Sequence, residues 1–391
     1  MMRRSPWTGL FATLGLVSAS LAIWMMGCSE TAEVDLLDPL PDAAPDTNLA
    51  ADVGPKEDAG CDGDACADEG PCGGAAWCPV DSGLTGRFGF LNVWGSSPED
   101  VWVVGNQGRV LHWDGATWTA TALDTEGALF NVRGRGPQEI WISSTPSLVA
   151  CSTGFEPDRA GVVETASFAS ILGTDRRRHH MALGALWVSP LGEVWVGASG
   201  SGTTTGGLWR SAVVDGGAGW VAAAPLRVNA IWGSGQGDVW IVGPLTSSPH
   251  GSMSSRTDGT VDGTGALTWT SLDAQSDYAL HGLWGSSPKD VWAVGAFGTI
   301  RHFGPNDERW RIVEVPTKKT LRAVWGSSPT DIWAVGDEAT IVHYDGTSWS
   351  LSTVALAPGI VPDFRGVWGS GADDVWAVGG DVIVRLAGRT P

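Results

Sequence analysis

The chain has 391 residues, among them 23 tryptophans, 55 glycines and only two tyrosines, and its formal net charge is −19. An acidic surface repels a phosphate backbone, so this charge argues against a nucleic-acid partner. Many aromatic residues and turn glycines, with few Lys and Glu residues, favour an all-β chain.

The first element in the chain, residues 1–27, has the pattern of an export signal. Arg3 and Arg4 give it a short basic start, and the apolar stretch from Leu10 to Met26 is short for a membrane-spanning helix. We therefore expect the chain to be exported from the cytoplasm.

The export signal ends in Met-Met-Gly-Cys28, which resembles a bacterial lipobox, where the cysteine after glycine becomes lipidated. Lipidation of Cys28 would hold the protein to the cell envelope, at the outer membrane or surface, without a spanning helix. The alternative is ordinary cleavage near Ser20-Leu21-Ala22, which would leave a secreted protein. We expect contact with a membrane through the lipid anchor alone.

Residues 28–74 are predicted to form a disordered acidic linker, because Asp, Ala, Pro and Gly dominate them and no apolar periodicity is present. Outside the cytoplasm, cysteines near the end of this linker are expected to pair as two disulfides, with three pairings open. They are Cys61, Cys66, Cys72 and Cys78. The acidic residues between them lack the EF-hand pattern, so we predict no metal site. Cys151 is left over, and we expect it to be buried.

Residues 75–391 contain a repeated unit, V-W-G-S-S-P-x-D-V-W-x-V-G, in strong and degenerate copies. The position of its first Trp recurs roughly every 45 residues, which is a propeller period and not that of a helical solenoid. The seven positions are Trp94, Arg133, Trp187, Trp232, Trp284, Trp325 and Trp368. The repeat predicts a seven-bladed β-propeller in which most tryptophans belong to the framework.

Each unit predicts four short strands. Gly-Ser-Ser-Pro-x-Asp forms a turn between the first two, and Asp-Gly forms a tight hairpin between the last two. The fourth strand opens with a tryptophan, namely Trp118, Trp220, Trp269, Trp310 or Trp349. The seventh unit lacks this strand, and Trp77 lies before the first unit at the matching spacing. We expect the segment around Trp77 to close the ring as the outer strand of the last blade.

The segments H-W-D-G-A-T-W, from His112 to Trp118, and H-Y-D-G-T-S-W, from His343 to Trp349, are similar to the Asp-box, or BNR, repeat. The whole unit resembles that of BNR-like bacterial cell-surface propellers. This resemblance implies a propeller fold with a structural Asp-box turn, here a variant that lacks one residue between Asp and Gly. It supports the fold far more than a function.

The same resemblance raises the question of sialidase chemistry, which uses a tyrosine nucleophile, a glutamate partner and three arginines. The chain has only Tyr278 and Tyr344, and Tyr344 occupies a framework position of the repeat. No arginine triad is evident. We therefore predict no catalytic residue and no cofactor.

One position of the repeat varies from unit to unit: the second residue of the first strand, beside the predicted channel. It is occupied by Leu91, Phe130, Gly184, Asn229, His281, Arg322 and Arg365. His281, Arg322 and Arg365 come from consecutive units and should converge near the channel mouth, where they would suit an anionic group. Asn229, in the preceding unit, is the fourth candidate ligand-binding residue.

Three features depart from the regular repeat. Residues 243–264 are rich in Ser, Gly and Thr and are expected to form a flexible loop. Residues 175–180 form a basic cluster, either a solvated loop or a contact for an anionic glycan or lipid. Trp209 and Trp220, in the irregular third unit, are weak candidates for stacking on a sugar.

Two hypotheses follow. The first is a monomeric, non-catalytic binding or scaffolding propeller at the cell envelope that recognises a glycan or a protein, with an adhesin-like role as one version. The second is a glycan-active enzyme, a sialidase-like hydrolase or lyase, on the same fold. An enzyme would gather carboxylates with Tyr or His in the central pocket, whereas a binding module would show a shallow polar channel.

Overall fold

The computed structural model describes residues 72–387, with gaps at 85–87, 124–126, 145–147, 153, 156–162, 168–181, 200–206, 215–216, 236, 246–250 and 264–265. The regular elements among the described residues are β-strands and one short 3-10 helix, η4 (Ala296–Gly298). The strands form seven four-stranded sheets. The all-β propeller predicted from the repeat is confirmed.

Six of these sheets are each built from four strands that follow one another in the chain. Sheet 1 contains β2 (Phe90–Ser97), β3 (Asp100–Gly105), β4 (Arg109–Trp113) and β5 (Trp118–Ala122). Sheet 2 contains β6 (Leu129–Gly136), β7 (Glu139–Ser144), β8 (Leu148–Ser152) and β9 (Val163–Ser167). Sheet 3 contains β10 (Ala182–Val188), β11 (Val194–Ser199), β12 (Gly207–Val214) and β13 (Gly217–Ala224). Sheet 4 contains β14 (Ala230–Trp232), β15 (Val239–Pro244), β16 (Ser252–Thr257) and β17 (Thr270–Asp273). Sheet 5 contains β18 (Leu280–Ser287), β19 (Asp290–Gly295), β20 (Thr299–Phe303) and β21 (Arg311–Val313). Sheet 6 contains β22 (Leu321–Ser328), β23 (Asp331–Gly336), β24 (Ile341–Tyr344) and β25 (Trp349–Leu351).

Sheet 7 contains strands from both ends of the described chain, in the order β1 (Trp77–Val80), β28 (Val382–Leu386), β27 (Asp374–Gly379) and β26 (Gly366–Gly371). β1 runs antiparallel to β28, with Trp77 opposite Leu386 and Val80 opposite Ile383. The Trp77 side chain is fully buried and meets Trp333 of sheet 6 edge-on, with ring centroids 5.1 Å apart. The N-terminal segment thus supplies the outer strand of this sheet.

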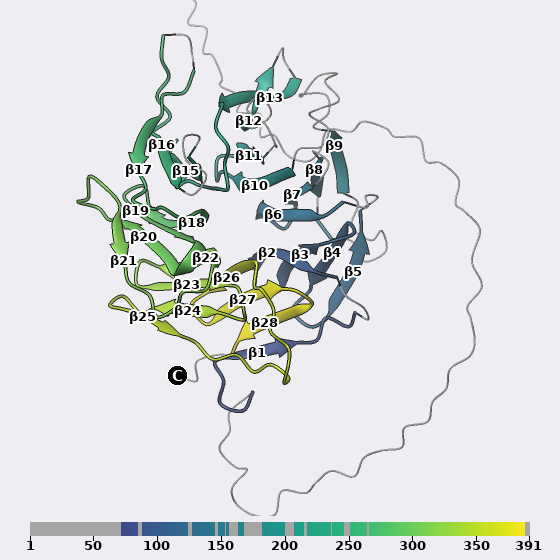
Figure 1. Ribbon diagram of the computed structural model, residues 1–391. Helices are drawn as coiled ribbons and strands as arrows, with labels where there is room; N and C mark the ends of the chain where they lie inside the picture. The colour runs from purple at the N-terminus through teal and green to yellow at the C-terminus, as the bar shows by residue number, and fades with distance from the viewer. Residues whose placement is uncertain are drawn as a thin grey trace, which may run out of the picture.

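The first strand of each sheet lies on the inner side of a ring (Figure 1). These inner strands contact one another in the order β2, β6, β10, β14, β18, β22, β26 and back to β2. Successive sheets therefore pack face to face around a common centre, and the side chains between them form the core.

Tryptophans fill much of the space between sheets. The repeat Trp on an inner strand lies opposite a Trp on the second strand, as Trp284 does with Trp292. The second-strand rings are buried, except that Trp141 of sheet 2 is partly buried. Trp376 of sheet 7 packs against Trp113 and Trp118 of sheet 1. Large flat side chains suit the wedge between neighbouring sheets, so these tryptophans belong to the framework, as the sequence predicted.

The Asp-Gly hairpins are held by their aspartates. The Oδ1 atom of Asp345 accepts hydrogen bonds from the backbone N–H groups of Thr347 and Ser348, both at 2.8 Å. Gly346 has a φ of 91°, a left-handed conformation that favours glycine. These backbone hydrogen bonds hold the pKa of Asp345 below its ordinary value. The Asp345-Gly346 turn is therefore a structural feature of the sheet.

A disulfide joins Cys72 to Cys78, with Cα atoms 5.5 Å apart. Cys78 lies in β1, so the bond ties the segment before this strand to the strand itself. Residues 1–71, which include Cys28, Cys61 and Cys66, lie outside the described residues, and so do the predicted export signal and nearly all of the predicted linker. No helix in the described part of the chain is long and apolar enough to cross a membrane.

The prediction of a flexible loop over residues 243–264 is wrong for its central part, which is the third strand of sheet 4, β16. Ser254 and Ser255 are buried in this strand. The Ser254 hydroxyl donates to the Leu272 carbonyl at 3.0 Å and accepts from the Trp310 indole N–H at 2.7 Å. Small hydroxyl residues with such partners can occupy a strand interior that composition alone assigns to a loop.

Candidate functional site

The variable position of the repeat lies at a β-bulge in the inner strands. In sheet 5 the register shifts between Leu280 and Gly282, so His281 is an extra residue without a partner opposite it. Arg322 is the extra residue of the corresponding bulge in sheet 6. A bulge frees a side chain from the regular alternation and re-aims it, which explains why this position tolerates different residues.

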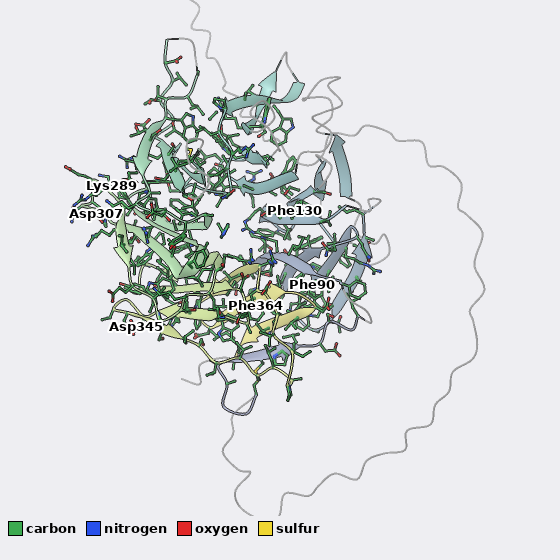
Figure 2. All side chains as sticks on the ribbon, viewed as in Figure 1. Phe90, Phe130, Lys289, Asp307, Asp345 and Phe364 are labelled. Atoms are coloured by element: carbon green, nitrogen blue, oxygen red, sulfur yellow. A yellow bond between two sulfur atoms is a disulfide. The ribbon has the colours of Figure 1, made fainter. Side chains whose placement is uncertain are left out.

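The same position in sheets 2, 4 and 7 follows this pattern. Phe130 is the bulge residue of sheet 2 and lies toward the inside of the ring (Figure 2). Asn229 and Arg365 come directly before β14 and β26, and their backbone N–H groups still bond to the second strand, at 2.8 and 2.7 Å. All of these side chains therefore start from the inner edge of the ring.

Arg322 and Arg365 both lie within electrostatic reach of His281. Burial lowers the pKa of His281, the Arg322 charge lowers it further, Asp337 partly opposes this, and Arg365 adds a smaller lowering. His281 is therefore neutral at neutral pH. The three basic residues, named together below as the inner-strand cluster, come from three neighbouring sheets.

Two carboxylates accompany the inner-strand cluster. Arg322 forms a two-pronged ion pair with Asp337, in which its Nη2 lies 2.9 Å from Oδ2 and its Nε donates to Oδ1. Arg365 meets Asp363 more loosely, at 3.5 Å, and keeps more than a third of its side chain exposed. Arg322 is therefore largely neutralised, while Arg365 offers the more accessible positive charge.

Asn229 has a different partner. Its side-chain amide donates to the Leu280 carbonyl at 2.9 Å, across the boundary between sheets 4 and 5. The structure therefore places Asn229 beside the cluster, as a link to the strand that carries His281, and the electrostatic contacts of the cluster do not include it.

Two other groups of candidates occupy structural positions or lie outside the description. Trp209 and Trp220 pack against the core cluster of sheet 3, and the Tyr344 hydroxyl donates to the Gly346 carbonyl at 3.0 Å. Tyr278 is exposed and packs against Phe297. The basic cluster at 175–180 and the side chain of Cys151 lie outside what the structure describes.

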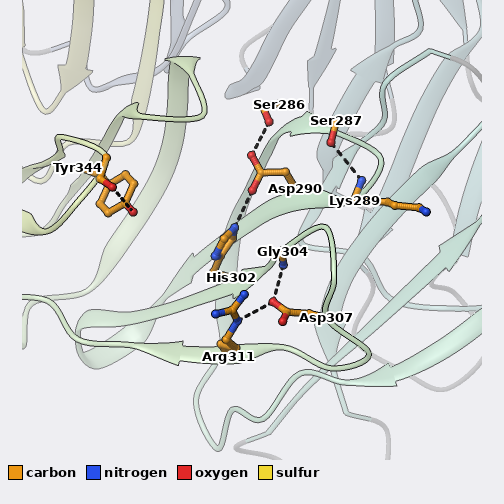
Figure 3. Close-up of polar contacts among 10 residues, drawn as sticks. Ser286, Ser287, Lys289, Asp290, His302, Gly304, Asp307, Arg311 and Tyr344 are labelled. Atoms are coloured by element: carbon orange, nitrogen blue, oxygen red, sulfur yellow. Dashed lines mark hydrogen bonds and ion pairs between the residues drawn. The ribbon is translucent and has the colours of Figure 1, made fainter.

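A hydrogen-bond network at the start of the second strands was not foreseen from the sequence. In sheet 5 the Asp290 carboxylate accepts from the Ser286 hydroxyl and bonds His302 Nε2 at 2.6 Å (Figure 3). Asp100 with His112 and Asp331 with His343 repeat the arrangement in sheets 1 and 6. The aspartate precedes its histidine by 12 residues each time, and this constant spacing was the available signal.

The network contains Ser, His and Asp, yet its order differs from that of a hydrolase triad. The carboxylate stands between the serine and the histidine, so no base contacts the hydroxyl. Burial raises the pKa of Asp100, but hydrogen bonds from His112, Ser96 and Trp102 outweigh this and leave the pKa below its ordinary value. The network therefore fixes the framework and holds a stable carboxylate.

A hollow of about 660 Å³ lies at the rim between sheets 5 and 6. Its walls include Trp292, Trp349 and Tyr344, which already pack in the core cluster between these sheets. His302 and Arg311 also line it, and both are tied to aspartates. No group of three potential metal ligands occurs in the described part of the chain.

No family model and no curated protein matches this chain. Solved structures do: YCF48 bound to D1 peptide is 16% identical, has a TM-score of 0.58, and its match covers 80% of this chain and 97% of that one. YCF48 from Cyanidioschyzon merolae is 16% identical with a TM-score of 0.56, and the match covers 80% of this chain and 99% of that one. The WD40 propeller domain of Doa1 is 14% identical with a TM-score of 0.57, and the match covers 78% of this chain and 94% of that one. This likeness shows the β-propeller fold, and no family match confirms the Asp-box relationship.

Proposed function

We propose that this chain is a non-catalytic binding or scaffolding protein, a propeller of seven blades that recognises an acidic segment of a partner polypeptide. The observation that carries the proposal is the inner-strand cluster. His281 and Arg322 are the bulge residues of β18 and β22, and Arg365 stands at the same repeat position directly before β26. Both arginines lie within electrostatic reach of His281. Guanidinium groups gathered in this way suit carboxylates.

Two further observations favour binding over catalysis. The carboxylates beside the inner-strand cluster, Asp337 and Asp363, are engaged by its arginines and are not poised as acid and base. The Ser–Asp–His networks hold their carboxylates in place and lack a base on the serine. A similar solved propeller, YCF48, is described as bound to a peptide, which supports a polypeptide as the class of partner.

The proposal is tested with the full chain and two probes, a capped hexaglutamate peptide and an array of anionic glycans. We expect the peptide to bind and Arg365→Ala to weaken binding about tenfold, because Arg365 supplies the accessible charge. Arg311→Ala, on the outer strand β21, is the matched control and should leave binding unchanged. Equal binding by Arg365→Ala, or binding to glycans alone, would contradict the proposal.

A gain-of-binding variant gives a second test. Asp337→Asn removes the carboxylate that neutralises Arg322, so affinity for the acidic peptide should rise several-fold. Affinity should also rise as the pH falls below about 6.5, because His281 takes up a proton only below its ordinary pKa and its charge then favours an anion. Unchanged affinity in both experiments would remove the cluster from the site.

We also propose export and attachment to the cell envelope through Cys28, on the strength of the leader and the lipobox-like sequence. Metabolic labelling with palmitate should mark the wild-type chain and not Cys28→Ser. Absence of label on the wild type, with the chain found free in the medium, would favour the secreted form.

A further inference from the structure

The inner strands carry no acidic residue, although the chain as a whole has a net charge of −19. Their charged or titratable residues are Arg133 and Arg135 of β6, His281 of β18 and Arg322 of β22. Arg135 is paired with Glu139 and Arg322 with Asp337, whereas no described acidic side chain bonds Arg133. The inner wall of the propeller therefore attracts anions, in contrast to the protein as a whole.

Arg133 belongs to a ring of large side chains at one level of the inner strands. Each member lies opposite a tryptophan of the second strand, so the register places them all at the same height. We name this set the central ring, and its members are Trp94, Arg133, Trp187, Trp232, Trp284, Trp325 and Trp368. Every member is partly exposed, although it stands within a strand. Solvent therefore reaches this level of the inner wall.

The indoles of the central ring offer hydrogen-bond donors and no acceptor. No described residue accepts a hydrogen bond from their N–H groups, and the fully buried indole N–H groups belong to other tryptophans. The far edges of these indoles pack on the next sheet, as Trp94 does on Gly134 and Trp284 does on Gly326. An anion at this level therefore meets N–H donors and the positive edges of aromatic rings.

The guanidinium of Arg133 keeps one edge free. Its Nη1 donates to Asn92 Oδ1 at 2.6 Å and to the Val132 carbonyl at 2.8 Å, so both hydrogen atoms of Nη1 are used. Nε and Nη2 have no acceptor among the described residues. Arg322 uses this same edge, Nε with Nη2, to hold the two oxygens of Asp337. Arg133 therefore presents the fork that binds a carboxylate through both oxygens.

Two buried asparagines hold Arg133 in this orientation. Asn92 and Asn131 lie two residues before the central ring, at a position where the other sheets have alanine or glycine. The Asn131 amide donates to the Ser143 hydroxyl at 3.2 Å and to the Gly184 carbonyl at 3.0 Å, and the Asn92 amide points to Asn131 Oδ1 at 3.5 Å. Loss of solvent lowers the pKa of Arg133 only to about 10, so the fixed guanidinium stays charged at neutral pH.

We propose that Arg133 and the central ring bind a small organic anion, a carboxylate with an apolar body. The free edge of Arg133 holds the carboxylate, and the indoles of the two adjacent sheets, Trp94 and Trp187, contact the apolar body. His281 and Arg322 precede the central ring by three residues, about 10 Å along a strand. The site is therefore distinct from the proposed acidic-peptide site and does not depend on it.

The first test uses benzoate and the full chain, with binding measured by calorimetry or ligand-observed NMR. Benzamide, which has the same shape and no charge, is the control ligand. We expect benzoate to bind with a millimolar Kd and benzamide to bind at least tenfold more weakly. Equal binding of the two ligands, or no binding of benzoate, would overturn the proposal.

The second test places the carboxylate within the molecule. Arg133→Gln removes the charge, retains a donor for Asn92 and should weaken benzoate binding at least tenfold. Arg311→Gln on the outer strand β21 removes the same charge from the chain and should leave benzoate binding unchanged. Wild-type affinity in Arg133→Gln would overturn the proposal. An equal loss in Arg365→Ala would place the carboxylate at the inner-strand cluster and overturn the assignment to Arg133.

A third variant covers the case in which Arg133→Gln fails to fold, which circular dichroism would reveal. Arg133→Lys keeps the positive charge and lacks the fork, so benzoate should bind about threefold more weakly than to the wild type. Full affinity in a folded Arg133→Lys variant would show that the guanidinium fork does not hold the carboxylate, and the proposed geometry would be wrong.

Discussion

In most of the sheets an acidic side chain near the start of the second strand is bonded by a basic side chain. Sheets 1, 5 and 6 use the same pair of residue types for this contact, whereas sheets 2 and 3 use different pairs. In the first group an aspartate at the start of the second strand bonds a histidine 12 residues later. In sheet 2 the acid is Glu139, which bonds Arg135 near the end of the first strand, β6. In sheet 3 the acid is Glu193, which bonds Arg210 on the third strand at 2.9 Å.

The difference shows that the sheets keep the bond between this acid and a basic side chain, while the residues that form it change from sheet to sheet. The residue opposite the second-strand Trp is a histidine in sheets 1, 5 and 6 and an arginine in sheets 3, 4 and 7, but Cys151 takes this place in sheet 2. In sheet 2 the donor to the acid Glu139 is Arg135 of the first strand. A partly buried acid without a donor would be costly, so the two changes belong together.

The largest effect is expected from removing the acid of a regular sheet. Asp290→Ala takes away the hydrogen bonds to Ser286 and His302 and leaves the histidine unpaired, at a cost of about 3 kcal/mol. Urea unfolding of the variant measures this. Lys289→Ala, the adjacent exposed residue, is the control and should stay within about 0.5 kcal/mol of wild type. Equal stabilities of the two variants would contradict a structural role for the network.

The next effect concerns the boundary between sheets 2 and 3. Arg133 and Val188 stand there in place of the Trp and the glycine that pack together at the other boundaries. Arg133→Trp alone should destabilise the protein by about 2 kcal/mol, because the new ring meets Val188 instead of glycine and the link to Asn92 is lost. Adding Val188→Gly should recover part of this loss, so the two changes should not be additive. A double-mutant cycle by urea unfolding measures the coupling, and strict additivity would show that the packing of the two residues is independent.

Much of the fold was predictable because each copy of the repeat contains the same strand and turn signals. The Trp pairs, the Asp-Gly hairpins and the spacing of Trp77 specify strands and their order without any long-range information. The Ser–Asp–His network escaped prediction because Asp290 and His302 meet only once two strands are in register. β16 escaped because its serines gain hydrogen-bond partners only inside the sheet.

The candidate site was predictable to a smaller extent. The position of His281, Arg322 and Arg365 in the repeat predicts that they lie on neighbouring inner strands. The structure places His281 and Arg322 there, and Arg365 directly before β26. The sequence could not show that Asp337 neutralises Arg322, because this acid comes from the loop after the second strand and has Ala296 or Gly380 as its counterparts in sheets 5 and 7. The irregular pair Arg133 and Val188 could be recognised only from the packing of Trp on glycine between neighbouring sheets.

The acid network should also make stability depend on pH. Burial raises the pKa of Asp290, but its hydrogen bonds with His302 and Ser286 prevail and lower it. A carboxyl with a lowered pKa in the folded state stabilises above its unfolded value of about 3.9, and this stabilisation is lost as the pH falls through the folded value. The stability difference between wild type and Asp290→Asn should therefore shrink between about pH 5 and 2.

This pH dependence is followed by urea unfolding at each pH, with Asp373→Asn as the control. Asp373 is exposed and has no hydrogen bond or ion pair among the described residues, so its variant should track the wild type throughout. A difference for Asp290→Asn that stays constant over this range would show that the carboxylate charge is not what the network stabilises.

The smallest effect is expected from exchanging one donor for another. Arg385 of sheet 7 stands in the position of His302, bonds Asp374 at 2.7 Å and lies over the Trp376 ring at 4.7 Å. His302→Arg should therefore keep the bond to Asp290 and change the free energy of unfolding by less than about 1 kcal/mol. His302→Ala removes the donor and should cost about twice as much. The His302 ring stacks on Trp292 with ring centroids 4.0 Å apart. If the two variants are equally destabilised, this stacking matters more than the hydrogen bond to Asp290. Arginine and histidine would then not be interchangeable donors to the acid.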